Sequence, residues 1–331
     1  MRKGLLILLG IAIIGVGPAI AGGQRATTDA VIELTAATIN PEDSHLARSM
    51  KAVLDAIERE SNGRISIAFY PGGQLGDASS LYESVVNGNI DIVMSDTGWF
   101  AQEHPEFDVL ESSYLFRDKE QYLRILNSDE RLGFFESLIL ERPGLRTLFY
   151  VGGMERNIIS TFPINNFSDL RGKTMRSRPV TTELEWWQLL GARPEAVAFQ
   201  ETYSAMQTGV VEGSQNSIDA MINMRFMEVA PYIARTQHAI HLGMVVINER
   251  RFQSLPSDLQ TLVVRVSREV QPEWLERAFV ESDEQLRTLQ QQHGVTVTHP
   301  NTAPFVDASR RQMLDIAREL QIEDVMREIF Y

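Results

Sequence analysis

Cysteine is absent from this sequence, and histidine is scarce, with six residues. The missing thiols exclude a disulfide-stapled scaffold, a cysteine nucleophile and a thiolate metal site. His238 and His241 are three positions apart in a segment predicted to be extended, so their side chains should point to opposite faces. A metal site built on these two histidines is therefore not expected, and no metal or cofactor is predicted.

Positive charge is also in short supply. The chain has 31 Lys and Arg residues against 44 Asp and Glu residues, which gives a formal net charge of −13. An acidic protein is repelled by nucleic acid and by anionic membrane surfaces, so neither is an expected partner. An anionic small molecule would have to be held by arginines gathered in one place, against the field of the whole protein.

The short motifs of common enzyme classes are missing as well. The sequence contains no GxSxG nucleophile elbow, no Walker phosphate loop and no HExxH metal motif. Pairs of acidic residues carry little information, because 44 acids produce coincidental pairs in any fold. A binding protein is the main interpretation. A secreted enzyme that uses Asp96 or Glu201 as a base is the alternative, and turnover of an organic acid would distinguish the two.

One apolar run at the N-terminus indicates export. Met1-Arg2-Lys3 forms a basic start, residues 5–16 are apolar, and small residues lead up to Ala21. This order is typical of a secretory signal peptide, predicted to span residues 1–21. An uncleaved membrane anchor is the alternative, but the run is short for a membrane span. The mature protein is expected in the bacterial periplasm, where a domain with a large core needs no disulfides.

Strand and helix patterns alternate through the first third of the sequence. Residues 31–37, 65–69 and 90–94 are short apolar or alternating runs that are typical of strands. Asp43 or Ser44 can cap a helix after the first run, and a second helix is expected beyond the turn at residues 71–77. Strand, helix, strand, helix, strand at these lengths predicts parallel βαβ units, and therefore an α/β fold.

Three segments resemble the motifs of one protein family. They read PGGQLGD at residues 71–77, SDLRGKTMR at residues 168–176 and QTGVVEGSQN at residues 207–216. These segments are similar to those of the solute-binding proteins of TRAP transporters, the DctP-type family that captures organic acids in the periplasm. Each motif is weak by itself, but their combination is specific, and the resemblance covers most of the sequence after the leader.

The resemblance implies a two-lobed periplasmic binding protein fold. Each lobe is then a mostly parallel sheet flanked by helices, and one long helix spans both lobes. Residues 30–150 are expected to form mainly the N-terminal lobe, residues 151–250 mainly the C-terminal lobe, and residues 251–331 the long helix and terminal segments that pack across both. Pro272 should break or kink that helix. The implied partners are a small organic acid and the small and large TRAP membrane subunits, and a monomer is expected.

An arginine carries the main site prediction. Its guanidinium presents a planar fork of donors that matches a carboxylate and stays charged at physiological pH. The family motifs place this arginine at Arg176 and a polar partner at Asn216, and they imply a second arginine at Arg156. A salt bridge to Glu155 is the structural alternative for Arg156. The residues expected to bind the ligand are Arg176, Arg156, Asn216, Asp96, Phe199, Ser44 and His45.

The other members of that set rest on position in the fold. Asp96 follows the third predicted strand, at the carboxyl end where α/β sheets bind ligands, although an ordinary turn or helix cap explains it equally well. Phe199 and Tyr203 share a helix face, which suits either an apolar wall for the ligand or the core. Ser44 and His45 belong to the segment 43–45, the other expected contribution of the N-terminal lobe.

The expected charges indicate a class of ligand. An ionised Asp96 would repel a second ligand carboxylate in a cleft of low dielectric. This favours a hydroxylated monoacid, such as a sugar acid, over a C4-dicarboxylate, which is the alternative ligand in the same role. The sequence departs from the usual family motif at residues 213–216 and at Asn40, beside the expected ligand. A ligand sensor for a membrane receptor is a further alternative with the same fold.

Overall fold

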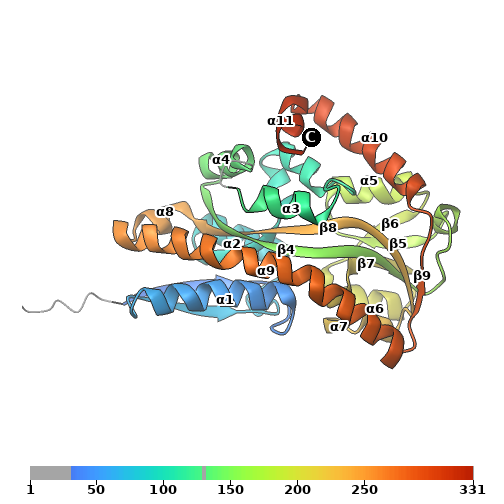
Figure 1. The fold of residues 1–331 in the computed structure, drawn as a ribbon, viewed down its shortest axis with the longest axis horizontal. Coiled ribbons are helices and arrows are strands. Elements are labelled where there is room, and N and C mark those ends of the chain that lie inside the picture. The colour runs from blue at the N-terminus through green and yellow to red at the C-terminus, as the bar shows by residue number, and fades with distance from the viewer. Residues whose placement is uncertain (1–30, 129–131, 331) are drawn as a thin grey trace, which may run out of the picture. The chain divides into compact units, whose positions relative to one another are not determined.

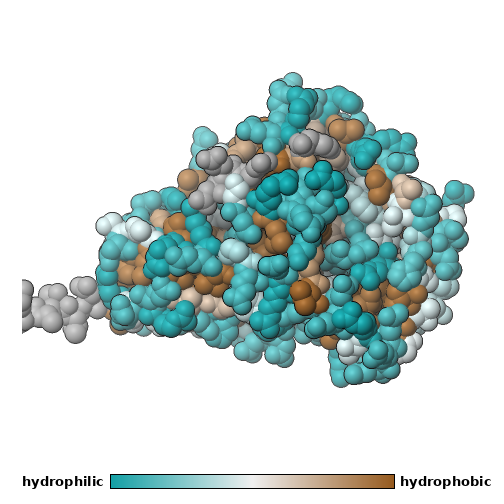
Figure 2. Space-filling view, in the orientation of Figure 1, coloured by the Kyte–Doolittle hydropathy of each residue, from teal (hydrophilic) through white to brown (hydrophobic). Residues whose placement is uncertain are grey.

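The computed structural model describes residues 31–128 and 132–330. The predicted signal peptide, residues 1–21, lies outside these ranges. Within them, no helix is long and apolar enough to cross a membrane. Figure 2 shows a mostly hydrophilic face on which apolar side chains gather in small separate patches. Many large apolar side chains lie in the interior, and Trp187, Phe107 and Phe135 are fully buried.

One mixed sheet organises the fold (Figure 1). Nine strands of the described ranges pair in the order β2-β1-β3-β8-β4-β7-β5-β6, with β9 beside β8. β1 is parallel to β2 and β3, and β5 is parallel to β6 and β7. The strands are β1 (Ile32–Ala37), β2 (Ile65–Tyr70), β3 (Ile92–Asp96), β4 (Leu145–Ser160), β5 (Thr174–Ser177), β6 (Arg193–Ala196), β7 (Gly213–Ser217), β8 (Tyr232–Asn248) and β9 (Thr296–Thr298).

The two parallel groups confirm the predicted fold class. The first group, β1 to β3, and the second group, β5 to β7, are the sheets expected of two α/β lobes. The long strands β4 and β8 pair antiparallel to each other between the groups. β8 also pairs with β3, and β4 also pairs with β7, so the two groups form one continuous sheet. The sequence did not predict this continuity, because it depends on pairing between segments that are far apart in the sequence.

Helices cover both faces of the sheet (Figure 1). The α-helices are α1 (His45–Glu60), α2 (Ala78–Asn87), α3 (Lys119–Leu126), α4 (Gly133–Glu141), α5 (Thr181–Leu189), α6 (Thr202–Gln207), α7 (Ile218–Asn223), α8 (Glu249–Gln253), α9 (Ser257–Gln292), α10 (Ala303–Glu319) and α11 (Glu323–Phe330). Short 3₁₀ helices are η1 (Thr97–Gln102), η2 (Pro105–Glu111), η3 (Phe167–Leu170), η4 (Phe199–Glu201) and η5 (Phe226–Glu228).

Several helices begin at side chains that cap their free N–H groups. The Ser44 hydroxyl accepts a hydrogen bond of 3.2 Å from the Ala47 N–H and begins α1. The Asp77 carboxylate accepts one of 2.9 Å from the Ser80 N–H and begins α2. Ser217 caps α7 in the same way. Such caps satisfy donors that the helix itself leaves unpaired, so local sequence determines where these helices begin.

The long helix α9 joins the two strand groups. It contacts α1, β4 and α7, and it lies along the sheet in Figure 1. The sequence predicts a break or a kink at Pro272, and the structure excludes the break, because the helix continues through this residue. Leu275 and Ala278 are buried within the next two turns, and the Leu275 carbonyl oxygen would lie 2.6 Å from a Cβ added at Gly153 of β4. Close packing against β4 therefore stabilises a continuous helix at a position where proline disfavours helical structure.

Candidate ligand-binding site

A cavity of about 550 Å³ lies between the two parallel strand groups. Both groups contribute to its wall, as do the central strands β4 and β8. Its polar lining consists of Asn40, Asp77, Ser79, Ser95, Asp96, Gln102, Arg156, Arg176, Arg178, Gln200, Asn216, Ser217 and His241, and the rest is apolar. A pocket of this size with a few convergent polar groups is the usual form of a small-molecule site.

Arg176, in β5, is a buried cation of this wall that keeps unused hydrogen-bonding capacity among the described residues. Its side chain is only 2% exposed, and Nε donates to the Val197 carbonyl oxygen at 2.9 Å. Nη1 is buried and has no partner within the described ranges. Burial lowers the pKa of Arg176 to about 10, so the guanidinium is still cationic at neutral pH. A buried cation with an unpaired donor is suited to receive an anion.

A second buried arginine, Arg156 in β4, stands close by. It pairs in register with Ser217 of β7, and its Nε donates to the Gln215 side-chain oxygen at 2.6 Å. Burial lowers its pKa, and so does the neighbouring Arg178. The alternative salt bridge to Glu155 is not formed among the described residues, where Glu155 lies 3.9 Å from Arg235 Nη2 and accepts a hydrogen bond from Gln237. Two guanidinium groups thus reach the same cavity from different strands.

The structure also brings Asn216 and Phe199 to this cavity. Asn216 is buried in β7, and its Nδ2 donates to the Ser214 hydroxyl at 3.1 Å. Phe199 begins η4 and contacts Phe226 edge to face, with ring centroids 6.2 Å apart. The Phe199 ring is half-buried, so one part of it packs in the core while another part lines the cavity.

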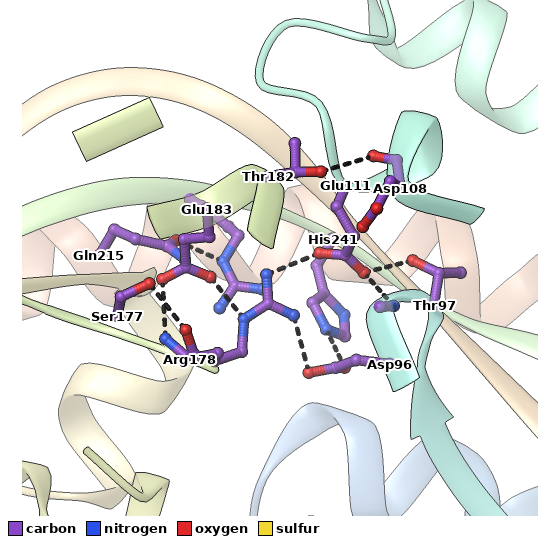
Figure 3. Close-up of polar contacts among 12 residues, drawn as sticks. Asp96, Thr97, Asp108, Glu111, Ser177, Arg178, Thr182, Glu183, Gln215 and His241 are labelled. Atoms are coloured by element: carbon purple, nitrogen blue, oxygen red, sulfur yellow. Dashed lines mark hydrogen bonds and ion pairs between the residues drawn. The ribbon is translucent and has the colours of Figure 1, made fainter. Parts of the chain in front are cut away.

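Arg178, two residues beyond Arg176, is surrounded by acids (Figure 3). Nη1 lies 3.2 Å from Asp96 Oδ2, Nη2 lies 2.6 Å from Glu111 Oε2, and Nε lies 2.6 Å from Glu183 Oε2. His241 Nε2 lies 2.9 Å from the other Asp96 oxygen. We call these five residues the Arg178 cluster. They come from β3, η2, α5, β8 and the segment after β5, so only the tertiary fold assembles them.

Burial and charge act against each other in the Arg178 cluster. Burial raises the pKa of Asp96, but His241, Arg178 and Arg156 outweigh it and hold that pKa well below its ordinary value. Burial likewise raises the pKa of Glu183, yet nearby arginines, led by Arg178, lower it to about 2. Both acids are therefore ionised at neutral pH, and Asp96 can only accept hydrogen bonds.

Ser44 and His45 are not among the residues that line the cavity, in contrast to the prediction. Ser44 caps α1, while the His45 ring meets Glu281 and the Trp274 carbonyl of α9, each at 3.0 Å. The adjacent Leu46 does line the cavity. Successive side chains on a helix point about 100° apart, which explains why His45 faces α9 and Leu46 faces the cavity.

The two central histidines have separate partners. His241 meets Asp96, whereas His238 contacts the Thr236 hydroxyl at 2.8 Å and stacks on Trp186. Burial lowers the pKa of His238 to about 3, so that ring is neutral at physiological pH. In the part of the protein that the structure describes, no group of three or more His, Asp or Glu is arranged to hold a metal ion.

Sequence reasoning missed several residues of the site. Arg178 has a usable signal, because it follows Arg176 by two residues, alternate residues of an extended segment point to the same side, and Arg176 is itself a predicted ligand contact. No sequence signal distinguishes Glu111 or Glu183 from the other acids. The sequence analysis considers His241 only as part of a metal site, which it does not expect, and not as a partner of Asp96. The cavity also includes Trp99 of η1, whose role depends on where the backbone turns after β3.

Comparison with known proteins identifies the family. Residues 36–320 match the family model described as bacterial extracellular solute-binding protein, family 7, or DctP. The chain belongs to this family. The resemblance in the sequence motifs is therefore confirmed. Members of this family are substrate-binding proteins of transporters and not a class of enzyme; they bind small organic acids outside the cytoplasm and work with membrane components.

Two relatives and one solved structure align with most of this chain. A solute-binding protein of Sulfitobacter sp. (strain NAS-14.1) is 30% identical over 246 residues, 74% of this chain and 74% of that protein. The sialic acid-binding periplasmic protein SiaP of Vibrio cholerae is 28% identical over 260 residues, 78% of this chain and 80% of SiaP. A crystal structure of a Sulfitobacter TRAP periplasmic solute binding protein with bound alpha-D-taluronate has a TM-score of 0.85 at 26% identity, covering 90% of this chain and 97% of that protein.

Proposed function

We propose that this DctP-family protein captures a hydroxylated monocarboxylic acid of the sugar-acid type and delivers it to the small and large membrane subunits of a TRAP transporter. The observation that carries the proposal is Arg176, a buried cation in the cavity wall whose Nη1 has no partner within the described ranges. A ligand carboxylate would supply the missing acceptor. Arg156 would hold the same carboxylate from a second strand, with Asn216 as a polar neighbour.

The rest of the cavity suits a hydroxylated carbon skeleton. Asp96 is ionised and accepts hydrogen bonds only, so it favours ligand hydroxyls and disfavours a second carboxylate. Trp99 and Phe199 offer apolar surface to the C–H faces of a sugar ring. Two similar proteins support this class, since one is named for sialic acid and the other was solved with taluronate. A hexuronate is the simplest ligand that combines these features.

Capture would proceed by closure of two lobes around the ligand. The lobes are those expected from the sequence, residues 30–150 and 151–250, with residues 251–331 packing across both. A ligand favours the closed state only if it contacts both lobes. Asp96 would provide the contact on the first lobe, and Arg176 and Asn216 those on the second. Export would depend on residues 1–21 as signal peptide, and the protein would act in the periplasm as a monomer without a cofactor.

Ligand-dependent stability tests this function. The mature protein, without residues 1–21, is expected to be stabilised by D-glucuronate or D-galacturonate. At 100 times the dissociation constant the gain is about 2.7 kcal/mol, which thermal unfolding detects easily. D-Glucose, which has the ring without the carboxylate, is the control and should have no effect. Stabilisation by succinate but not by hexuronates would contradict the ligand class, and no response to any acid would contradict the function.

A further inference from the structure

Arg178 differs from the arginine two residues before it. Each of its three guanidinium nitrogens already pairs with a different carboxylate, at 2.6 to 3.2 Å. Its side chain is 12% exposed, and those of Glu111 and Glu183 are 7% and 5% exposed. Arg176 in contrast keeps a buried nitrogen without a partner in the described ranges. All three guanidinium nitrogens of Arg178 are therefore occupied by protein carboxylates, while Arg176 has a nitrogen that a ligand can use.

The position of Asp96 depends directly on Arg178. One carboxylate oxygen lies 3.2 Å from Arg178 Nη1, and the other lies 2.9 Å from His241 Nε2. Figure 3 shows Asp96 held between these two groups. Two donors fix the rotation of the carboxylate, and each oxygen retains a lone pair for a further hydrogen bond. Asp96 lines the cavity, so those lone pairs are the ones that a ligand hydroxyl can reach.

Charge balance gives Arg178 a second effect. Three arginines (Arg156, Arg176 and Arg178) and three acids (Asp96, Glu111 and Glu183) influence one another in this buried region. Glu183 attracts Arg176 as well as Arg178. If Arg178 did not occupy these acids, Arg176 and Arg156 would be the nearest cations that could pair with them. By pairing with these acids, Arg178 keeps them from forming ion pairs with Arg176 and Arg156, the two arginines that the proposed function assigns to the ligand carboxylate.

We propose that Arg178 is a positioning residue that fixes Asp96 as the acceptor for ligand hydroxyls and leaves Arg176 free for the ligand carboxylate. It is then a determinant of selectivity for hydroxylated acids over acids of the same shape without hydroxyls. This inference rests on the proposed function. Glu111 and Glu183 contribute indirectly to this positioning role, because they hold the Arg178 guanidinium in place from η2 and α5.

The test compares two ligands in two variants of the mature protein. The ligands are D-glucuronate and tetrahydropyran-2-carboxylate, which keeps the ring and the carboxylate but has no hydroxyls. Removing Arg178 alone would leave buried acids unpaired and endanger folding. The main variant is therefore Arg178→Gln combined with Glu183→Gln, which removes one charge of each sign. Arg178→Lys is the second variant, because it keeps the charge but loses the fork that reaches three acids.

Calorimetric titration should separate the two ligands. In the double variant we expect D-glucuronate to bind about tenfold or more weakly, while the analogue without hydroxyls changes less than threefold. Arg178→Lys should show a smaller loss in the same direction. If the double variant does not fold, Arg178→Lys decides the question. Equal losses for both ligands, or no loss for either, would overturn the inference.

A pH profile supplies a readout that a purely structural role would not change. The groups that act on Asp96 are His241 of β8, Arg156 of β4 and Arg178, the last shared with Glu111 and Glu183. In the natural protein Asp96 stays ionised down to about pH 4.5, where the ligand also remains ionised, so protonation of Asp96 should cause no loss of affinity for D-glucuronate in this range. In the double variant, Arg178 no longer offsets the effect of burial, so the pKa of Asp96 rises. Asp96 then becomes protonated at low pH and loses acceptor capacity, so the affinity of the variant for D-glucuronate should fall as the pH is lowered.

The control results separate this inference from the proposed function. Arg171→Gln removes one arginine charge from an exposed side chain just before β5 and should leave both affinities unchanged. If the natural protein binds neither acid, the proposed function fails and the inference fails with it. If the natural protein binds both acids but the double variant has a flat pH profile and unchanged selectivity, only the role of Arg178 is overturned.

Discussion

Replacement of Arg176 by glutamine is expected to weaken hexuronate binding about 100-fold or more. The variant removes the buried cation whose Nη1, unpaired among the residues that the structure describes, is the proposed partner of the ligand carboxylate. Truncating one member of a buried, hydrogen-bonded charge pair costs about 2–5 kcal/mol, and each 1.4 kcal/mol corresponds to about tenfold in affinity. Calorimetric titration of the mature protein with D-glucuronate measures this loss directly.

Two further variants make the Arg176 result specific. Arg176→Lys keeps the charge but not the planar fork, so an intermediate loss is expected. Arg171→Gln removes an exposed arginine from the same segment and should bind as the natural protein does. Circular dichroism checks that each variant is folded. Natural affinity in Arg176→Gln would mean that the ligand carboxylate is held elsewhere, and Arg156→Gln would then be the variant to examine.

Replacement of Gly152 by alanine is expected to destabilise the protein by about 3 kcal/mol or more. Gly152 has φ of +142°, a conformation that residues with a Cβ rarely adopt. An added Cβ would overlap the His241 carbonyl oxygen and would lie 2.6 Å from the Tyr122 hydroxyl, which donates to that same carbonyl at 2.7 Å. Because β4 and β8 meet here and His241 holds Asp96, ligand binding should weaken together with stability.

Denaturant unfolding followed by circular dichroism measures the effect at Gly152. Gly133→Ala is the matched control, because a Cβ added at this first residue of α4 would meet no heavy atom within 4 Å. That change should alter the free energy of unfolding by less than about 1 kcal/mol, in the stabilising direction, since alanine favours a helix more than glycine does. Equal stability of the two variants would contradict the close approach of β4 and β8.

Sequence alone determined the family, the fold class and the arginines proposed for the ligand. This was possible because the informative signals are local. The motif at residues 168–176 contains Arg176 and the motif at residues 207–216 contains Asn216, so a contiguous stretch of sequence carries each side chain to the cavity wall. Helix caps such as Ser44 are equally local, since a cap involves only the next three residues.

Tertiary structure decided what depends on residues far apart in the sequence. The pairing of β4 with β8 joins two parallel groups into one sheet. Helix α9, which packs on β4, continues past Pro272 without a break. The same long-range packing turns His45 towards α9. The Arg178 cluster is the strongest case, because its acids stand at positions 96, 111 and 183 and nothing in the sequence singles them out. Charges interact through space and not along the sequence, so only the folded arrangement showed that Arg178 is paired with acids while Arg176 keeps a nitrogen without a partner in the described ranges.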